Sequence, residues 1–249
     1  NLGTSLLIQG RTEDALEHYL KALQIKPDHA MSHYNVGNII TKQGNTEEAI
    51  EHYLKALQTE PDDAFVHNNL GLALSMLGRT EEAIKHYLQA LRIIPDHAME
   101  HYNLGNELSK KDRTEEAVEH YLQALQINPD YAIAHNKLGL TLYKQGRNEE
   151  AIVHYLKALR INPNDMLAHN NLAILLINKG DIKGAIVHYM KVLRINPDDT
   201  IVHNNLGNLL FRKGDIKGAI VHLRKALSIE PDNIKVKNNL NEVLMLQQR

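Results

Sequence analysis

The seven prolines of this chain recur at a constant interval of 34 residues. They are Pro27, Pro61, Pro95, Pro129, Pro163, Pro197 and Pro231. A fixed period of this length is typical of a repeated helix–turn–helix unit. One such hairpin cannot bury its apolar face alone, so neighbouring hairpins must stack, each contacting only those beside it. We therefore expect a single array of thin layers rather than one globular core.

The proline interval also sets the boundaries of the repeats. If proline is residue 32 of each repeat, a partial repeat at residues 1–29 precedes six full repeats, and a terminal helix at 234–249 follows them. The full repeats are residues 30–63, 64–97, 98–131, 132–165, 166–199 and 200–233. Because the chain begins at Asn1, inside a repeat, we expect it to be part of a longer protein.

Twelve of the 14 glycines fall at two positions of the repeat. Position 15 lies between two helical patterns, where a left-handed glycine can end the first helix. Position 8 lies inside the first helix, where glycine costs roughly 1 kcal/mol relative to alanine. We expect that cost to be offset by close approach of the paired helix. The position-8 glycines are Gly3, Gly37, Gly71, Gly105, Gly139 and Gly207.

The repeat resembles the consensus of the tetratricopeptide family over essentially the whole chain. The residues that carry the resemblance in one repeat are Leu70, Gly71, Ala83, Tyr87, Ala90 and Pro95. The resemblance implies an all-α, right-handed α-solenoid, a superhelix whose first helices line a concave groove. One departure is systematic, since position 4 is histidine here and often tryptophan in the family. Three local departures are Asp112 at position 15, Ala173 at position 8, and Asn241 at position 8 of the last helix.

Composition excludes several classes of function. The net charge is −2, without the basic excess of nucleic-acid-binding domains. The chain has no cysteine, so thiolate catalysis and cysteine-ligated zinc are excluded. No apolar run approaches the ~20 residues that a membrane-spanning helix needs, and no signal peptide is evident, so we expect no membrane insertion and a cytoplasmic location.

Histidines and carboxylates are abundant but repeat with the lattice. Of 15 histidines, 13 lie at position 4 or position 23. Packed helices lie ~8–10 Å apart, whereas metal ligands converge to ~2 Å from the ion, so one histidine per layer is a poor chelator. Catalysis needs a unique cluster of side chains, and here each candidate recurs. We therefore expect no enzyme activity, metal or cofactor, and we expect the histidines to charge near pH 6 and make association pH-sensitive.

Asparagine forms a row at position 6, interrupted by Lys137. The row is Asn1, Asn35, Asn69, Asn103, Asn171, Asn205 and Asn239, and Asn38, Asn106 and Asn208 at position 9 lie about one turn further along. One interpretation is structural, with each amide bonded to a neighbouring helix. The other is a ladder of carboxamides that grips a peptide backbone, because each amide offers a donor and an acceptor in one plane. The row resembles the asparagine ladder in the tetratricopeptide domains of O-linked N-acetylglucosamine transferases.

Other positions refine these hypotheses. Position 2 is apolar and position 13 is often basic, but the family's clamp for chaperone tails is absent, because position 5 carries tyrosine or asparagine. The segments Lys179–His188 and Lys213–His222 are nearly identical, which indicates an internal duplication.

The sequence therefore predicts a scaffold that binds an extended peptide or partner protein in its groove. Two alternatives remain open. The chain could self-assemble through its groove or ends, or it could be the substrate-recruiting arm of a larger enzyme such as a glycosyltransferase.

Overall fold

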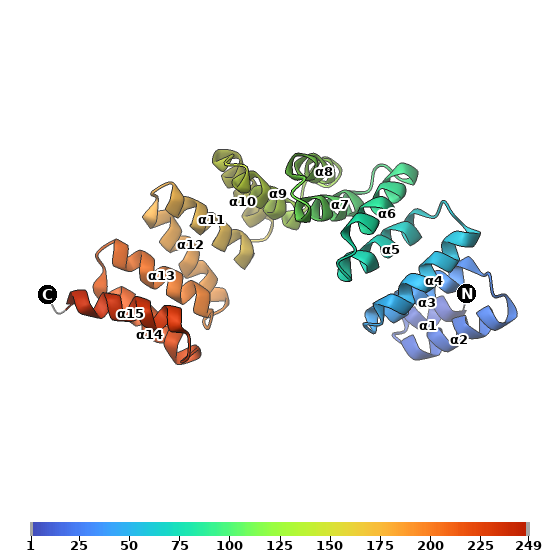
Figure 1. Ribbon diagram of the computed structural model, residues 1–249, viewed down its shortest axis with the longest axis horizontal. Coiled ribbons are helices and arrows are strands. Elements are labelled where there is room, and N and C mark those ends of the chain that lie inside the picture. The colour runs from blue at the N-terminus through green and yellow to red at the C-terminus, as the bar shows by residue number, and fades with distance from the viewer. Residues whose placement is uncertain (1, 248–249) are drawn as a thin grey trace. The chain divides into compact units, whose positions relative to one another are not determined.

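The computed structural model describes residues 2–247, and these form 15 α-helices and no strand (Figure 1). The helices are α1 (Leu2–Ile8), α2 (Thr12–Ile25), α3 (Ala30–Lys42), α4 (Thr46–Thr59), α5 (Ala64–Met76), α6 (Thr80–Ile93), α7 (Ala98–Lys110), α8 (Thr114–Ile127), α9 (Ala132–Lys144), α10 (Asn148–Ile161), α11 (Met166–Asn178), α12 (Ile182–Ile195), α13 (Thr200–Arg212), α14 (Ile216–Ile229) and α15 (Ile234–Gln247). The predicted all-helical fold is confirmed.

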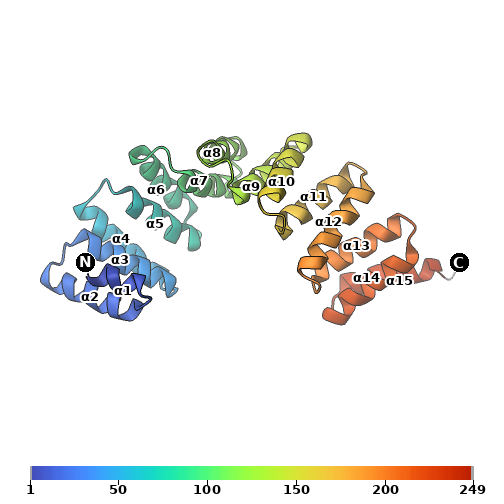
Figure 2. The ribbon, with the colours of Figure 1, turned by 180° about the vertical axis from the view of Figure 1, so that it is seen from behind.

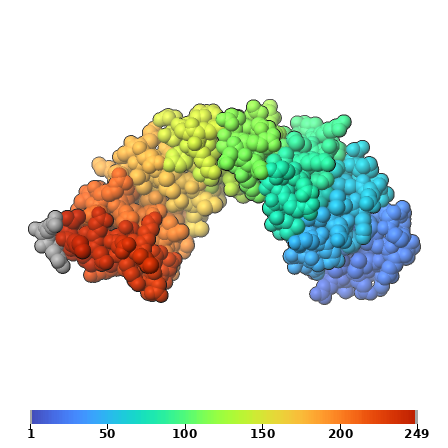
Figure 3. Space-filling model, viewed as in Figure 1, coloured from blue at the N-terminus to red at the C-terminus, as the bar shows by residue number. Residues whose placement is uncertain are grey.

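Consecutive helices pair as hairpins, and the hairpins fall into two compact units. Unit 1 is Asn1–Pro129 and unit 2 is Asp130–Arg249. Within each unit an odd-numbered helix, the first of its repeat, packs against the second helix of its own repeat and of the repeat before (Figure 2). In the space-filling view, successive colours follow one another across each unit, as nearest-neighbour stacking predicts (Figure 3).

The turn inside each hairpin has the backbone that the glycine pattern predicts. Position-15 glycines have positive φ angles, between 72° and 88°. They are Gly10, Gly44, Gly78, Gly146, Gly180 and Gly214. In the repeat 98–131, Asp112 takes this place with a φ of 56°. Asp is one of the few residues other than glycine that adopt the left-handed conformation, so the turn has the same backbone here.

Position 8 is where the two helices of a hairpin come closest. A Cβ atom added to Gly37 would lie 2.7 Å from the ring of Tyr53, and one added to Gly71 would lie 2.9 Å from Tyr87. The predicted close approach is confirmed, and its partner is the tyrosine at position 24. These tyrosines are almost fully buried in six of the repeats, and Leu223 takes their place in the repeat 200–233.

Candidate functional site

The odd-numbered helices of unit 1 carry a pocket of about 340 Å³ between α3 and α5. Its lining residues are Asn38, Thr41, Lys42, Tyr53, Asn69 and Leu72. Tyr53 reaches the pocket from α4 and forms its floor. The predicted asparagines at positions 6 and 9 thus meet, but they come from different repeats, since Asn38 belongs to one layer and Asn69 to the next.

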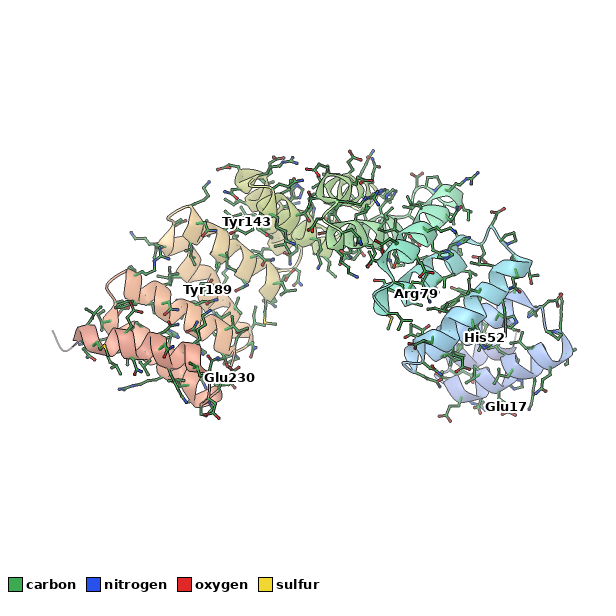
Figure 4. All side chains as sticks on the ribbon, viewed as in Figure 1. Glu17, His52, Arg79, Tyr143, Tyr189 and Glu230 are labelled. Atoms are coloured by element: carbon green, nitrogen blue, oxygen red, sulfur yellow. The ribbon has the colours of Figure 1, made fainter. Side chains whose placement is uncertain are left out.

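Unit 2 contains the equivalent pocket between α11 and α13, also of about 340 Å³. Its lining residues are Ile174, Ile177, Tyr189, Asn205, Asn208, Leu209 and Arg212. Tyr189, labelled in Figure 4, again comes from the second helix. The two pockets share positions 9, 12 and 24 of one repeat and positions 6 and 9 of the next. Each also contains a cation at position 13, but Lys42 comes from the first repeat of its pocket and Arg212 from the second.

Hydrogen bonds order the side chains of the unit 1 pocket. The Tyr53 hydroxyl donates to Oδ1 of Asn38 at 2.8 Å, and Nδ2 of Asn69 donates to the same oxygen at 2.7 Å. Burial raises the pKa of Tyr53 to about 12, so the hydroxyl keeps its proton and remains a donor at neutral pH. In the repeat 98–131, Tyr121 donates to Asn106 in the same way, at 2.8 Å.

The other asparagines of the row connect neighbouring repeats. Nδ2 of a position-6 asparagine donates to Oδ1 of an asparagine at position 5 of the repeat before. These bonds are Asn103 to Asn68 (3.4 Å), Asn171 to Asn136 (3.1 Å) and Asn239 to Asn204 (2.7 Å). The structural interpretation of the row therefore accounts for one N–H group of each of these amides.

The remaining asparagines of the predicted site differ in their partners. Asn35 donates to the carbonyl of Met31 one turn earlier, at 2.7 Å, and Asn205 shares a hydrogen bond with Tyr189. Asn208 lines the unit 2 pocket. Asn1 lies outside the described residues. The nine described asparagines of the site are all half-buried, so each keeps part of its amide surface exposed.

Sequence reasoning missed the asparagines at position 5. Asn68, Asn136 and Asn204 are buried and accept the bonds from the next repeat. Their sequence signal was an asparagine at position 5 of four full repeats, 35 residues ahead of position 6 of the next repeat.

The two histidine rows, at positions 4 and 23, form pairs within each full repeat. Nδ1 of the position-4 histidine lies 2.8–2.9 Å from Nδ1 of the position-23 histidine. The pairs are His33–His52, His67–His86, His101–His120, His135–His154, His169–His188 and His203–His222. Figure 4 labels His52 on α4. We call these the histidine pairs.

Each histidine pair has a defined tautomer when neutral. Nε2 of His33, for example, lies 2.9 Å from the carbonyl of Pro27, which can only accept, so Nε2 carries the proton. Nδ1 of His33 is then the acceptor, and His52 must donate its Nδ1–H. The pair thus joins the loop before the repeat, the first helix and the second helix.

The pairing corrects the expectation of charging near pH 6 for the position-23 members of the six histidine pairs. Burial, followed by the positive charge of the partner imidazole, lowers the pKa of each of these six side chains. The pKa falls to about 4 for His86, His154 and His188. Protonation of these imidazoles therefore belongs to a more acidic range.

Residues 2–247 lack the features of a metal site and of a membrane span. No cluster of three or more His, Asp or Glu side chains there could hold a metal ion. No helix in the same range is long and apolar enough to cross a bilayer.

The fold and the pockets define an α-helical repeat protein whose first helices carry pockets on their exposed surface. Comparison with family models identifies its family. Models described as tetratricopeptide repeat match residues 1–58, 28–96 and 201–233, and one described as TPR repeat matches 105–146, 141–180 and 175–214. These matches cover most of the chain, which therefore belongs to the tetratricopeptide repeat family. No curated protein matches the sequence.

Solved structures of the same fold include several bacterial proteins. YrrB, described as a TPR protein with an unusual peptide-binding site, is 25% identical, with 76% of this chain and 97% of YrrB covered and a TM-score of 0.64. A MamA fragment from Desulfovibrio magneticus is 25% identical, with 68% and 96% covered and a TM-score of 0.64. PilF of Pseudomonas aeruginosa, at 22% identity, shares the fold, with 86% and 97% covered and a TM-score of 0.74.

Proposed function

We propose that this chain is a protein-interaction scaffold whose odd-numbered helices bind an extended polypeptide segment. The observation that carries the proposal is the repetition of one pocket, at equivalent positions, in both units. Each copy has a buried tyrosine as its floor and half-exposed carboxamides in its wall. A repeated site suits a ligand with a repeating chemical unit, and an extended polypeptide backbone is such a ligand.

The chemistry of the pockets fits a peptide in two ways. An asparagine amide has two N–H donors and an oxygen with two acceptor positions, so the bonds within the protein leave part of its capacity for a ligand. An extended peptide presents its own N–H and C=O groups at ~3.3 Å per residue. Each pocket, at about 340 Å³, lies within the size range of ligand sites and can receive a side chain.

The bonds between repeats support binding rather than compete with it. Asn69 is fixed by Asn38, and Asn38 by Tyr53, before any ligand arrives. A ligand that meets amides already held in place loses less conformational entropy on binding. The structural and the ladder interpretations of the asparagine row are thus compatible.

YrrB supports the same proposal, because that protein has a peptide-binding site and shares this fold. The asparagine ladder proposed from the resemblance to O-linked N-acetylglucosamine transferases remains a prediction. So does a role as the recruiting arm of a larger enzyme, which would use the same surface.

The test is binding of peptides selected from a random display library against the chain, measured by fluorescence anisotropy. The double variant Asn69→Ala/Asn205→Ala removes one amide from each pocket, and we expect affinity to fall about tenfold or more, or ~1.4 kcal/mol. Asn164→Ala is the matched control, because Asn164 is exposed in a loop away from both pockets. Unchanged affinity in a folded double variant would contradict the proposal.

A further inference from the structure

The two units carry opposite charge, although the whole chain is nearly neutral. Unit 1 has 19 Asp and Glu against 11 Lys and Arg, a net charge of −8. Unit 2 has 11 Asp and Glu against 17 Lys and Arg, a net charge of +6. Such an asymmetry between halves points to a charged partner.

The difference is concentrated at the start of the second helices. Acidic pairs begin α4, α6, α8 and α10: Glu47–Glu48, Glu81–Glu82, Glu115–Glu116 and Glu149–Glu150. In α12 and α14, the duplicated segment replaces the acidic pair with Lys183–Gly184 and Lys217–Gly218. Neither of these two helices contains any acidic residue.

Lysine at this place is locally unfavourable, because the first turn of a helix has a partial positive charge. The segment compensates with a cap. Asp181 accepts a hydrogen bond from the backbone N–H of Gly184, and Asp215 from that of Gly218, each at 2.9 Å. Glycine at residue 184 leaves room for the carboxylate, since a Cβ atom there would require Asp181 to shift. Lysine thus stands against the helix dipole, and the Asp cap offsets its cost. Such a departure from local preference is expected where a residue serves function.

The exposed surface of α12 and α14 combines cations with apolar side chains, and we call it the basic face. Its apolar members are Val187, Met190 and Val221, which are 53%, 49% and 63% exposed. Its cations are Lys183, Lys191, Arg194, Lys217, Arg224 and Lys225. Among the described residues, only Lys225 of these six forms an ion pair, with Asp198 at 2.7 Å.

The corresponding surface of unit 1, on α4, is complementary, and we call it the acidic face. Glu47, Glu48 and Glu51 are exposed there and form no ion pair with any described residue. Leu54, at the repeat position of Met190, is 44% exposed. Each face therefore sets an apolar side chain beside charges whose net sign is opposite, although α4 also carries the exposed Lys55, at the repeat position of Lys191.

We infer that the basic face of unit 2 docks on the acidic face of unit 1 in a second copy of this chain. The argument for a second copy is complementarity of charge. Five cations of the basic face and the three carboxylates of the acidic face form no ion pair with any described residue. Glu47 and Lys183 occupy the same position of their repeats, so the two faces set opposite charges at an equivalent place. The contact uses second helices and leaves the odd-numbered helices of the peptide site free.

The test is sedimentation velocity on the whole chain. We expect self-association at about 100 μM in about 20 mM salt, and its loss in about 0.5 M salt, where exposed charges are screened. Lys183→Glu/Lys217→Glu and Glu47→Lys/Glu48→Lys should each weaken it about tenfold. An equimolar mixture of the two variants should restore association, because each then supplies the face that the other lacks.

The reversed variants remain informative, because Glu at positions 183 and 217 complements the helix dipole and should not impair folding. Lys137→Glu/Lys144→Glu is the matched control, with the same charge change in unit 2 but on α9, a first helix. It should leave association unchanged. A wild-type chain that stays monomeric at low salt overturns the inference. A mixture of the two reversed variants that fails to restore association also overturns it. Binding of the basic face to phosphatidylserine vesicles by a monomeric chain does not rescue the inference.

Discussion

The pockets of unit 1 and unit 2 use the same repeat positions, but the hydrogen-bond partner of the buried tyrosine hydroxyl comes from a different repeat in each. Tyr53 donates to Asn38, a residue of its own repeat. In unit 2 the equivalent of Asn38 is Ile174, which offers no polar atom, and Tyr189 bonds instead with Asn205 of the following repeat. Both pockets therefore have a buried tyrosine at the floor, but its hydrogen-bond partner lies in a different repeat.

This difference shows which part of the site is constrained. A buried hydroxyl without a partner costs about 1–3 kcal/mol, and in both pockets an asparagine supplies one. The equivalent hydroxyl of Tyr155 has no partner among the described residues, so a partner is favoured but not required. The wall residues carry no such cost. In unit 1 they are Asn38 and Thr41, and in unit 2 Ile174 and Ile177. We therefore expect the unit 1 pocket to favour polar side chains of a bound peptide and the unit 2 pocket apolar ones.

Acid should have the largest effect, because the histidine pairs occur in both units. In the folded chain, burial and the partner imidazole lower the pKa of His86, His154 and His188 to about 4, below the ordinary value of 6.5. The unfolded chain thus binds more protons below about pH 6.5, and stability falls as the pH drops from there towards 4. Melting temperatures across this range check the direction.

The pairs also predict the order of events. One proton per pair keeps both hydrogen bonds, because a doubly protonated imidazole can still donate from Nδ1 to its neutral partner. A second proton places two N–H groups face to face. Replacing His188 and His154 with Gln should flatten the pH dependence, and a variant as acid-sensitive as the wild type would show that the pairs do not cause it.

The next largest effect is expected from removing the tyrosine floor. Tyr53→Ala and Tyr189→Ala should each lower the free energy of unfolding by about 3–5 kcal/mol, because both side chains are almost fully buried. Tyr189→Leu is the matched control, since Leu223 occupies this position in the repeat 200–233, and it should cost less. Denaturant titration measures the losses. Markedly unequal losses for the two alanine variants would mean that the two floors are not equivalent.

Position 8 also differs between the two pocket-bearing repeats, because Ala173, which shares a core cluster with Tyr189, stands where Gly37 faces Tyr53. Gly37→Ala places a Cβ atom 2.7 Å from the Tyr53 ring, an overpacking of about 1–3 kcal/mol that exceeds the ~1 kcal/mol gained in helix propensity. Ala173→Gly loses that propensity, ~1 kcal/mol, without relieving a clash. Opposite substitutions should therefore both destabilise in thermal melts, and a stabilised Gly37→Ala variant would argue against tight packing at position 8.

How far the sequence predicted these features depends on the range over which each residue acts. Proline and glycine act within one turn, so the boundaries of the hairpins and the left-handed position-15 residues could be read from their spacing. The pairing of His33 with His52 joins two helices across 19 residues, and two rows at different positions gave no sign of it. The partner of Asn69 could not be predicted either, because it depends on the stagger between layers.

The smallest effect is expected from exchanging the wall residues, and it tests the comparison most directly. Asn38→Ile leaves the Tyr53 hydroxyl with only Thr41, whose Oγ1 lies 3.2 Å away, and should cost about 1 kcal/mol. Ile174→Asn gives Tyr189 a second neighbour that can bond and should change stability by less than about 1 kcal/mol.

The informative readout of this exchange is selectivity, not stability. If the walls set the preference of each pocket, the double variant Asn38→Ile/Ile174→Asn should exchange the two preferences. Its unit 1 pocket should then select apolar peptide side chains, and its unit 2 pocket should select polar ones. The wild-type selection is the control, because both proteins have the same floors and the same overall composition. Identical selections would mean that the pockets do not read side chains and that the asparagine amides grip the backbone alone.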